Sequence, residues 1–242
     1  MHARTQLIPV IDLLGGHVVR GVRGDRQAYR PIVSALCQSS APLVVARLLC
    51  EHCASRQLYV ADLDALMGGA VQVAVLRELL QGLPAIEELW VDGGFADADA
   101  AATLIDALGP DGRRVVPVFG SESLRSRAVL AACFDRSSAI GARAVLSLDR
   151  RDGQRLDPAG CWDAPALWPQ RVIVMTLERV GSGAGPDLQT LQDVQAQAPA
   201  ATLVGAGGLR SPADLALAAE AGAAAWLVAS ALHDLQIPRV PR

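Results

Sequence analysis

The chain contains no lysine and no asparagine, so all 22 of its Lys+Arg residues are arginine. A GC-rich genome is the simplest explanation for this replacement of lysine by arginine. Because a protein-bound imine needs a lysine amine, the absence excludes aldolase and transaldolase mechanisms that form a Schiff base with the enzyme.

Cysteine, charge imbalance and long apolar runs are also scarce. Five cysteines scattered through 242 residues are typical of reduced thiols rather than a disulfide framework. A net charge of −3 gives no electrostatic reason to expect binding to nucleic acid or to an anionic membrane. No apolar run approaches the roughly 18 residues that span a bilayer, and no signal-peptide pattern opens the sequence. These features predict a cytoplasmic protein with neither nucleic-acid nor membrane partners.

The apolar content of 51% is enough for a large core. Short apolar runs alternate with helical patterns such as Pro42–Ala54, Ala70–Leu80 and Ala98–Leu108, which indicates parallel βαβ units. Eight such units predict a single (β/α)8 barrel over residues 1–242, with an open doubly wound sheet as the alternative. The expected strands are Leu7–Asp12, Leu58–Asp64, Glu88–Asp92, Arg114–Phe119, Ala144–Asp149, Arg171–Thr176, Ala201–Gly205 and Ala225–Ala229.

An internal repeat favours the closed barrel, with half-barrels of about residues 1–135 and 136–242. The two halves correspond at a glycine pair after the third and seventh strands, and at a serine after the fourth and eighth. They also correspond at an aspartate that ends the first and fifth strands, Asp12 and Asp149. A two-fold repeat in a closed barrel predicts that these aspartates lie on opposite sides of one mouth. Two carboxylates there are candidates for general acid and base.

The repeated glycines predict two phosphate sites. Glycine lets backbone N–H groups approach an anion closely, and the helix that follows directs its positive end to the same place. Loops after the seventh and eighth strands are the usual phosphate site of this fold. Tight turns are the alternative explanation of the glycines. The candidate residues are Gly93, Gly94, Gly120, Ser121, Gly207, Gly208, Ala229 and Ser230.

The sequence resembles the histidine-biosynthesis phosphosugar barrels, which comprise a ribotide isomerase and its cyclase sister. The similarity extends over essentially the whole chain. It rests on Ile8–Arg20, Gly24-Asp25, Tyr59–Asp64, Asp92–Gly94, Leu148-Asp149, Gly181-Ser182, Gly185-Pro186 and Gly207-Gly208. It implies a ribulose-phosphate-binding barrel and a substrate with a phosphate at each end. It also implies that Asp12 is the base and Asp149 the acid.

The implied reaction is an Amadori rearrangement of an aminoaldose to an aminoketose. One acid protonates the ring oxygen so that the sugar opens to an imine, and a base removes the C2 proton to give an enaminol. Because the substrate supplies the amine, the reaction needs no lysine, metal or other cofactor. Arg20, Asp62, Thr176 and Ser182 are candidate substrate-binding residues.

Departures from the family pattern are concentrated at positions that the resemblance assigns to substrate binding. Met175 and Val180 replace a threonine and an aspartate around the sixth strand, and Asp92 and Phe95 interrupt a glycine run. Arg20 replaces a lysine of the cyclase, which weakens the cyclase interpretation. The chain therefore resembles a divergent branch like the isomerase-related proteins of methanogens and methylotrophs.

Three functions remain open from these patterns. A phosphosugar isomerase of histidine biosynthesis is the first, and an enzyme of one-carbon cofactor metabolism with another phosphorylated substrate is the second. A barrel that binds a phosphorylated sugar-type small molecule without turnover is the third. The sequence allows a homo-oligomer. Cys50 and Cys53 have CxxC spacing, but zinc needs about four ligands and no second pair is present, so no metal site is expected.

Overall fold

A computed structural model describes residues 5–21 and 29–240 of the chain. The segment from Gly21 to Ile32, whose arginine and glycine content predicts a long loop, lies largely outside these residues, and the Gly24-Asp25 pair lies wholly outside them. In the described part no helix is both long and apolar enough to cross a membrane.

Eight parallel strands form a closed barrel, as the alternation of apolar runs predicts. The order of hydrogen-bonded neighbours is β10, β9, β8, β6, β5, β4, β3 and β1, and β10 pairs with β1 to close the ring. This closure confirms the (β/α)8 barrel and excludes the open sheet. The barrel strands are β1 (Gln6–Leu14), β3 (Gln57–Asp62), β4 (Glu88–Asp92), β5 (Val115–Gly120), β6 (Val145–Arg151), β8 (Arg171–Thr176), β9 (Thr202–Ala206) and β10 (Ala225–Val228).

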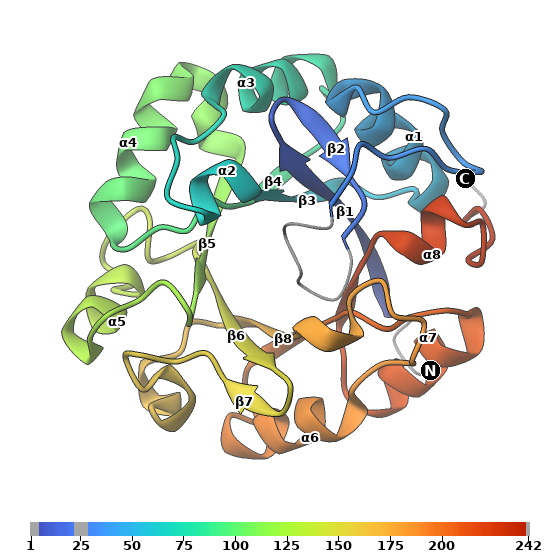
Figure 1. Cartoon of the computed structure of the whole chain (residues 1–242). Coiled ribbons are helices and arrows are strands. Elements are labelled where there is room, and N and C mark those ends of the chain that lie inside the picture. Colours follow the sequence, from blue (N-terminus) through green and yellow to red (C-terminus); the bar gives the residue numbers. More distant parts are fainter. Residues whose placement is uncertain (1–4, 22–28, 241–242) are drawn as a thin grey trace.

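Helices surround the barrel, and the chain passes once around it until the last helix returns beside the first (Figure 1). The α-helices are α1 (Pro42–Cys53), α2 (Leu63–Leu66), α3 (Val73–Gly82), α4 (Ala98–Leu108), α5 (Arg127–Cys133), α6 (Leu188–Gln197), α7 (Pro212–Glu220) and α8 (Ser230–His233). Between β6 and β8 the described chain forms short 3-10 turns, Cys161–Asp163 and Pro165–Leu167, and no α-helix. A further 3-10 turn, Gly109–Arg114, precedes β5, and another, Leu177–Arg179, follows β8.

Two hairpins lengthen the strands that carry the predicted acids. β2 (His17–Val19) runs antiparallel to the end of β1, and β7 (Gln154–Arg155) does the same for β6. The expectation that Asp12 and Asp149 end their strands is therefore wrong, because antiparallel pairing continues β1 to Leu14 and β6 to Arg151. The hairpins occupy equivalent places in the two halves and extend the internal repeat.

Alternate residues of each strand face the inside of the barrel, as the two-residue period of a strand requires. The interior is filled mainly by aliphatic side chains together with Tyr59 and Trp90, whereas a larger apolar cluster packs the outer face of the strands against the helices. Near the amino-terminal ends of the strands, Arg171 bridges to Glu88 across the interior at 2.8 Å. Tyr59 and Ala61 belong to the interior cluster, so Asp62, the next residue of β3, faces outward.

Candidate active site

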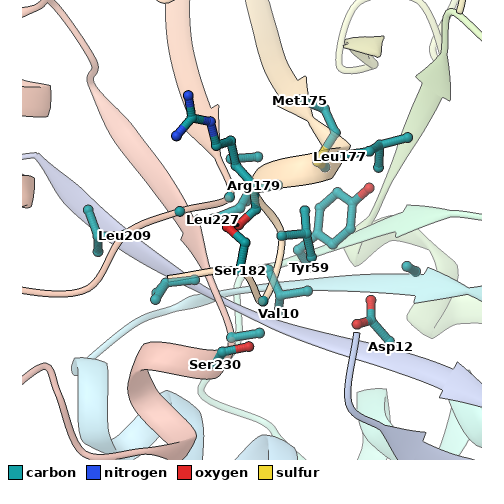
Figure 2. Close-up of a pocket in the computed structure, with 18 of the residues that line it drawn as sticks. Val10, Asp12, Tyr59, Met175, Leu177, Arg179, Ser182, Leu209, Leu227 and Ser230 are labelled. Carbon is teal, nitrogen blue, oxygen red and sulfur yellow. Dashed lines mark hydrogen bonds between the residues drawn. The ribbon is translucent and has the colours of Figure 1, made fainter. Parts of the chain in front are cut away.

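A cavity of about 350 Å³ opens where the strands end and the loops after them begin. Its size is within the range of small-molecule sites. Figure 2 shows Ser182 and Ser230 together on one side of this cavity, with Asp12 farther along it. The polar and glycine residues that line it are Asp12, Arg20, Tyr29, Tyr59, Asp92, Glu122, Asp149, Arg151, Arg179, Gly181, Ser182, Gly183, Gly207, Gly208, Ser230, Asp234 and Gln236.

The two predicted acids line this same cavity from opposite halves of the barrel. Each carboxylate lies against a glycine that leaves room for it. A Cβ on Gly21 would be 2.8 Å from Asp12 Oδ2, and a Cβ on Gly120 would be 3.0 Å from Asp149 Oδ2. β1 and β6 therefore hold both carboxylates at one end of the barrel, where they can act on one ligand.

Asp149 is buried, with 7% of its surface exposed. Ser147 Oγ donates to Asp149 Oδ1 at 2.6 Å, and the amide of Asp149 donates to Ser121 Oγ at 2.9 Å. Burial raises the pKa of the Asp149 carboxyl well above its ordinary value, and the nearby Glu122 and Asp92 carboxylates raise it further. These effects favour the protonated form that a general acid needs at neutral pH.

Tyr59, Asp92 and Glu122 also line the cavity, although the sequence patterns did not mark them as site residues. Tyr59 donates from its hydroxyl to Asp92 Oδ2 at 3.1 Å. Burial raises the pKa of Tyr59, and the charges of Asp92, Asp149 and Asp12 add to this effect. Strand alternation could have identified Asp92, because it is two residues after the inward-facing Trp90.

The second glycine pair lies at the other end of the cavity. Gly207, Gly208 and Ser230 line it, together with Ala229 at the start of α8. Ala229 makes no side-chain cap to α8, and within the described chain Ser230 Oγ has no hydrogen-bond partner. Backbone N–H groups at a helix start and a hydroxyl are suitable donors to a phosphate.

Arg20 and Ser182 reach the cavity but already have partners. Arg20 forms a bidentate pair with Asp234, with distances of 3.0 and 2.7 Å, and this hydrogen bonding raises the pKa of the guanidinium. Ser182 Oγ donates to the Arg179 carbonyl at 2.8 Å. Both residues shape the cavity wall with groups that a ligand would have to share.

The first glycine set does not line the cavity. A Cβ on Gly93 would be 3.0 Å from the Phe95 ring, and Gly94 packs on Leu66. Ser121 Oγ donates to the Leu156 carbonyl at 2.8 Å. The predicted phosphate residues that lie outside the cavity lining are Gly93, Gly94, Gly120 and Ser121.

Asp62 and Thr176, two predicted substrate contacts, also lie outside the cavity lining. Asp62 caps α2 by accepting from the Ala65 amide, and it accepts from the Gln72 amide at 2.6 Å. Thr176 donates to Asp187 Oδ2 at 2.9 Å. Their polar groups stabilise loops and helix starts.

No group of three or more His, Cys, Asp or Glu residues suited to a metal occurs in the described parts of the chain. Cys50 and Cys53 are buried in α1, and burial raises the pKa of each thiol to about 12. Both thiols are therefore protonated, unreactive members of the core.

The closed barrel and its acid-lined cavity define the class: a (β/α)8 barrel with a cavity at the carboxyl-terminal mouth. The chain belongs to the histidine biosynthesis protein family, whose pattern matches residues 6–238.

Individual relatives cover nearly the full chain. A phosphoribosyl imidazole-4-carboxamide isomerase of Sorangium cellulosum is 30% identical, with 95% of this chain and 94% of that protein aligned. An isomerase of the same name from Thermomicrobium roseum is 28% identical over 94% of this chain and 92% of that protein. An uncharacterised protein of Methanocaldococcus jannaschii is also 28% identical, over 94% of this chain and 93% of that protein. The identity to the named isomerases is therefore moderate at best.

Proposed function

We propose that this protein is a phosphosugar isomerase that converts a phosphorylated aminoaldose to an aminoketose without a cofactor. One observation carries the proposal: Asp12 and Asp149 enter a single cavity from opposite halves of the barrel. The names of the Sorangium and Thermomicrobium relatives support an isomerase activity.

The environment of Asp149 supports the proposed division of roles between the two carboxyl groups. Asp149, whose raised pKa keeps its proton, protonates the ring oxygen of the aminoaldose and opens the ring to an imine. Asp12 then removes the C2 proton to give an enaminol. The enaminol takes up a proton from Asp12 at C1 and loses its C2 hydroxyl proton to Asp149, which gives the aminoketose and restores both acids. The amine nitrogen of the substrate carries the charge of the imine.

The phosphate of the substrate binds at Gly207, Gly208 and the start of α8. This position is the usual phosphate site of the fold. The donors are backbone amides and Ser230 Oγ, and the ligand then extends from this end of the cavity toward Asp12 and Asp149.

Two substrates are candidates. The family supports the ribotide of histidine biosynthesis. The names of the Sorangium and Thermomicrobium isomerases contain two phosphoribosyl groups, which also supports this substrate. One observation favours a phosphorylated substrate other than the ribotide, for which one-carbon cofactor metabolism is the alternative. Asp92 and Glu122 line the cavity in the half where the first glycine set was expected to bind a phosphate.

Substitution of the acids tests the proposal. Asp12→Asn and Asp149→Asn should each lower kcat by about 10²- to 10⁴-fold, the range for loss of a general acid or base. Both variants should still bind inorganic phosphate in a thermal-shift assay. Asp106→Asn, an exposed change on α4, is the control.

Complementation of a histidine auxotroph that lacks the isomerase separates the two substrates. Growth with the wild-type chain but not with either acid variant supports the ribotide. Lack of growth with a folded, phosphate-binding wild-type protein supports the second substrate. Growth with either acid variant at the wild-type rate would contradict the acid–base roles.

A further inference from the structure

The two ends of the cavity present opposite chemistry to a ligand. One end offers glycine backbone, the start of α8 and Ser230, which suit an anion. At the other end, the carboxyl groups of Asp92, Glu122 and Asp149 line the wall beside Tyr59. This asymmetry is unexpected in a barrel whose halves repeat each other in sequence.

Two of these acids, Glu122 and Asp92, act on the third through their charges. The charges of Glu122 and Asp92 both raise the pKa of Asp149, and the charge of Asp92 also raises that of Tyr59. Among the described residues, Asp92 and Glu122 therefore bring negative charge to this part of the cavity. A phosphate placed here would face like charges in a partly desolvated site, where screening is weak.

The arginines of the cavity do not offset this charge equally. Arg20 is paired with Asp234, and Arg179 donates to the Ala184 carbonyl at 3.0 Å in the loop after β8. Arg151 lies at the acid end, two residues after Asp149 on β6. Asp149 keeps its proton, so among the described residues of this end one arginine stands beside the carboxylates of Asp92 and Glu122, and negative charge is in excess.

We propose that Asp92 and Glu122 determine substrate specificity, and that they select a ligand with one phosphate and with an amine in place of a second phosphate. The carboxylates accept hydrogen bonds from the amine and attract its positive charge. This inference rests on the phosphate site of the proposed function. It also agrees with the absence of the first glycine set from the cavity lining, since no second phosphate has to be bound.

Two matched ligand pairs test this selection by isothermal titration calorimetry on the full chain. Fructose 6-phosphate and fructose 1,6-bisphosphate differ by the second phosphate, and glucose 6-phosphate and glucosamine 6-phosphate differ by the amine. We expect the second phosphate to weaken binding and the amine to strengthen it, each by about tenfold, because like charges repel and opposite charges attract in a site of low dielectric. Inorganic phosphate serves as the probe of the glycine end.

Neutral variants identify the residues responsible. Two affinity ratios are compared: fructose 6-phosphate to fructose 1,6-bisphosphate, and glucosamine 6-phosphate to glucose 6-phosphate. Glu122→Gln and Asp92→Asn should each reduce both ratios about threefold or more, since each removes one negative charge from the acid end. Neither should change the affinity for inorganic phosphate. Asp106→Asn should leave both ratios unchanged, and Arg151→Gln should weaken the bisphosphate further.

The results also separate this inference from the proposed function. If fructose 1,6-bisphosphate binds at least as tightly as the monophosphate, or if the amine brings no gain, the selection is overturned although the isomerase proposal stands. Ratios that do not change in Glu122→Gln and Asp92→Asn overturn the assignment to these residues. If neither inorganic phosphate nor any sugar phosphate binds, the phosphate site fails, and the inference that rests on it fails as well.

Discussion

The loops after β4 and β5 and the loops after β9 and β10 share a sequence repeat but differ in what surrounds them. Gly207 and Gly208 line the cavity. Gly93 lies over Phe95, whose ring packs edge-on against Phe119 in an aromatic group that does not line the cavity. The comparison shows that a repeat can preserve the turns of the backbone, while neighbouring side chains decide whether the turns line the cavity.

The largest expected difference between the two regions is in their tolerance of a Cβ. Gly208→Ala should lower the free energy of unfolding by about 3 kcal/mol or more, because φ is +79° and the new Cβ would overlap the Gly185 carbonyl. The matched change Gly94→Ala, with φ of +62° and 3.3 Å to Leu66 Cα, should cost about 1–2 kcal/mol.

Urea unfolding measures these costs, and titration with inorganic phosphate measures the site. We expect Gly208→Ala to weaken phosphate binding and Gly94→Ala to leave it unchanged. If the Gly94 variant loses more phosphate affinity than the Gly208 variant, the two ends of the cavity have been assigned in the wrong order.

The repeated serines should differ next. Ser121→Ala should cost about 1–3 kcal/mol of stability, because it leaves the buried Asp149 amide and the Leu156 carbonyl without a partner. Ser230→Ala should change stability by less than about 0.5 kcal/mol but weaken phosphate binding by about 3- to 10-fold.

Thermal unfolding with and without phosphate distinguishes the two serines. A large loss of stability in Ser230→Ala, together with unchanged phosphate affinity, would mean that both serines have the same structural role. The contrast between the halves would then be lost at these positions.

The smallest expected effect is on the pH dependence of stability. The pKa of Asp149 is raised above its ordinary 3.8, so the folded state keeps a proton that the unfolded chain loses. The wild-type chain therefore loses stability as the pH rises from about 4 toward the raised pKa. Asp149→Asn has no such loss, so its stability relative to wild type should increase over this range.

Asp214 at the start of α7 should behave in the opposite way. Hydrogen bonds from Arg210 lower its pKa below 3.8, so its stabilising effect is present above this pH and is lost as the pH falls through the lowered pKa. Asp214→Asn should be less stable than wild type at pH 7 and approach it in acid. Urea unfolding at several pH values measures both trends. If the stability of the two variants relative to wild type changes with pH in the same direction, the pKa directions assigned to Asp149 and Asp214 are contradicted.

Much of the fold follows from sequence pattern. β4, β8 and α4 have the bounds that the apolar periodicity predicts, because buried parallel strands and amphipathic helices have distinct periods. The sequence did not predict that β1 and β6 run past their aspartates. The antiparallel partners β2 and β7 that extend them are too short to give a pattern of their own.

The candidate site was predictable in part. The acid pair and the second glycine pair meet at the cavity, whereas Asp62 faces away because it is one residue out of phase with the inward-facing Ala61. Glu122 could not be inferred, since it follows the strand in a loop where no period applies.

The sequence by itself determined the alternation of strands and helices, the two-fold repeat and the two aspartates that correspond in it, because these depend on the order and chemistry of nearby residues. Only the tertiary structure decided which glycine pair meets the cavity and which end of it is acidic. These properties depend on the volumes, hydrogen bonds and charges that distant strands bring to one place, such as Phe119 beneath one turn and Leu156 beside Ser121.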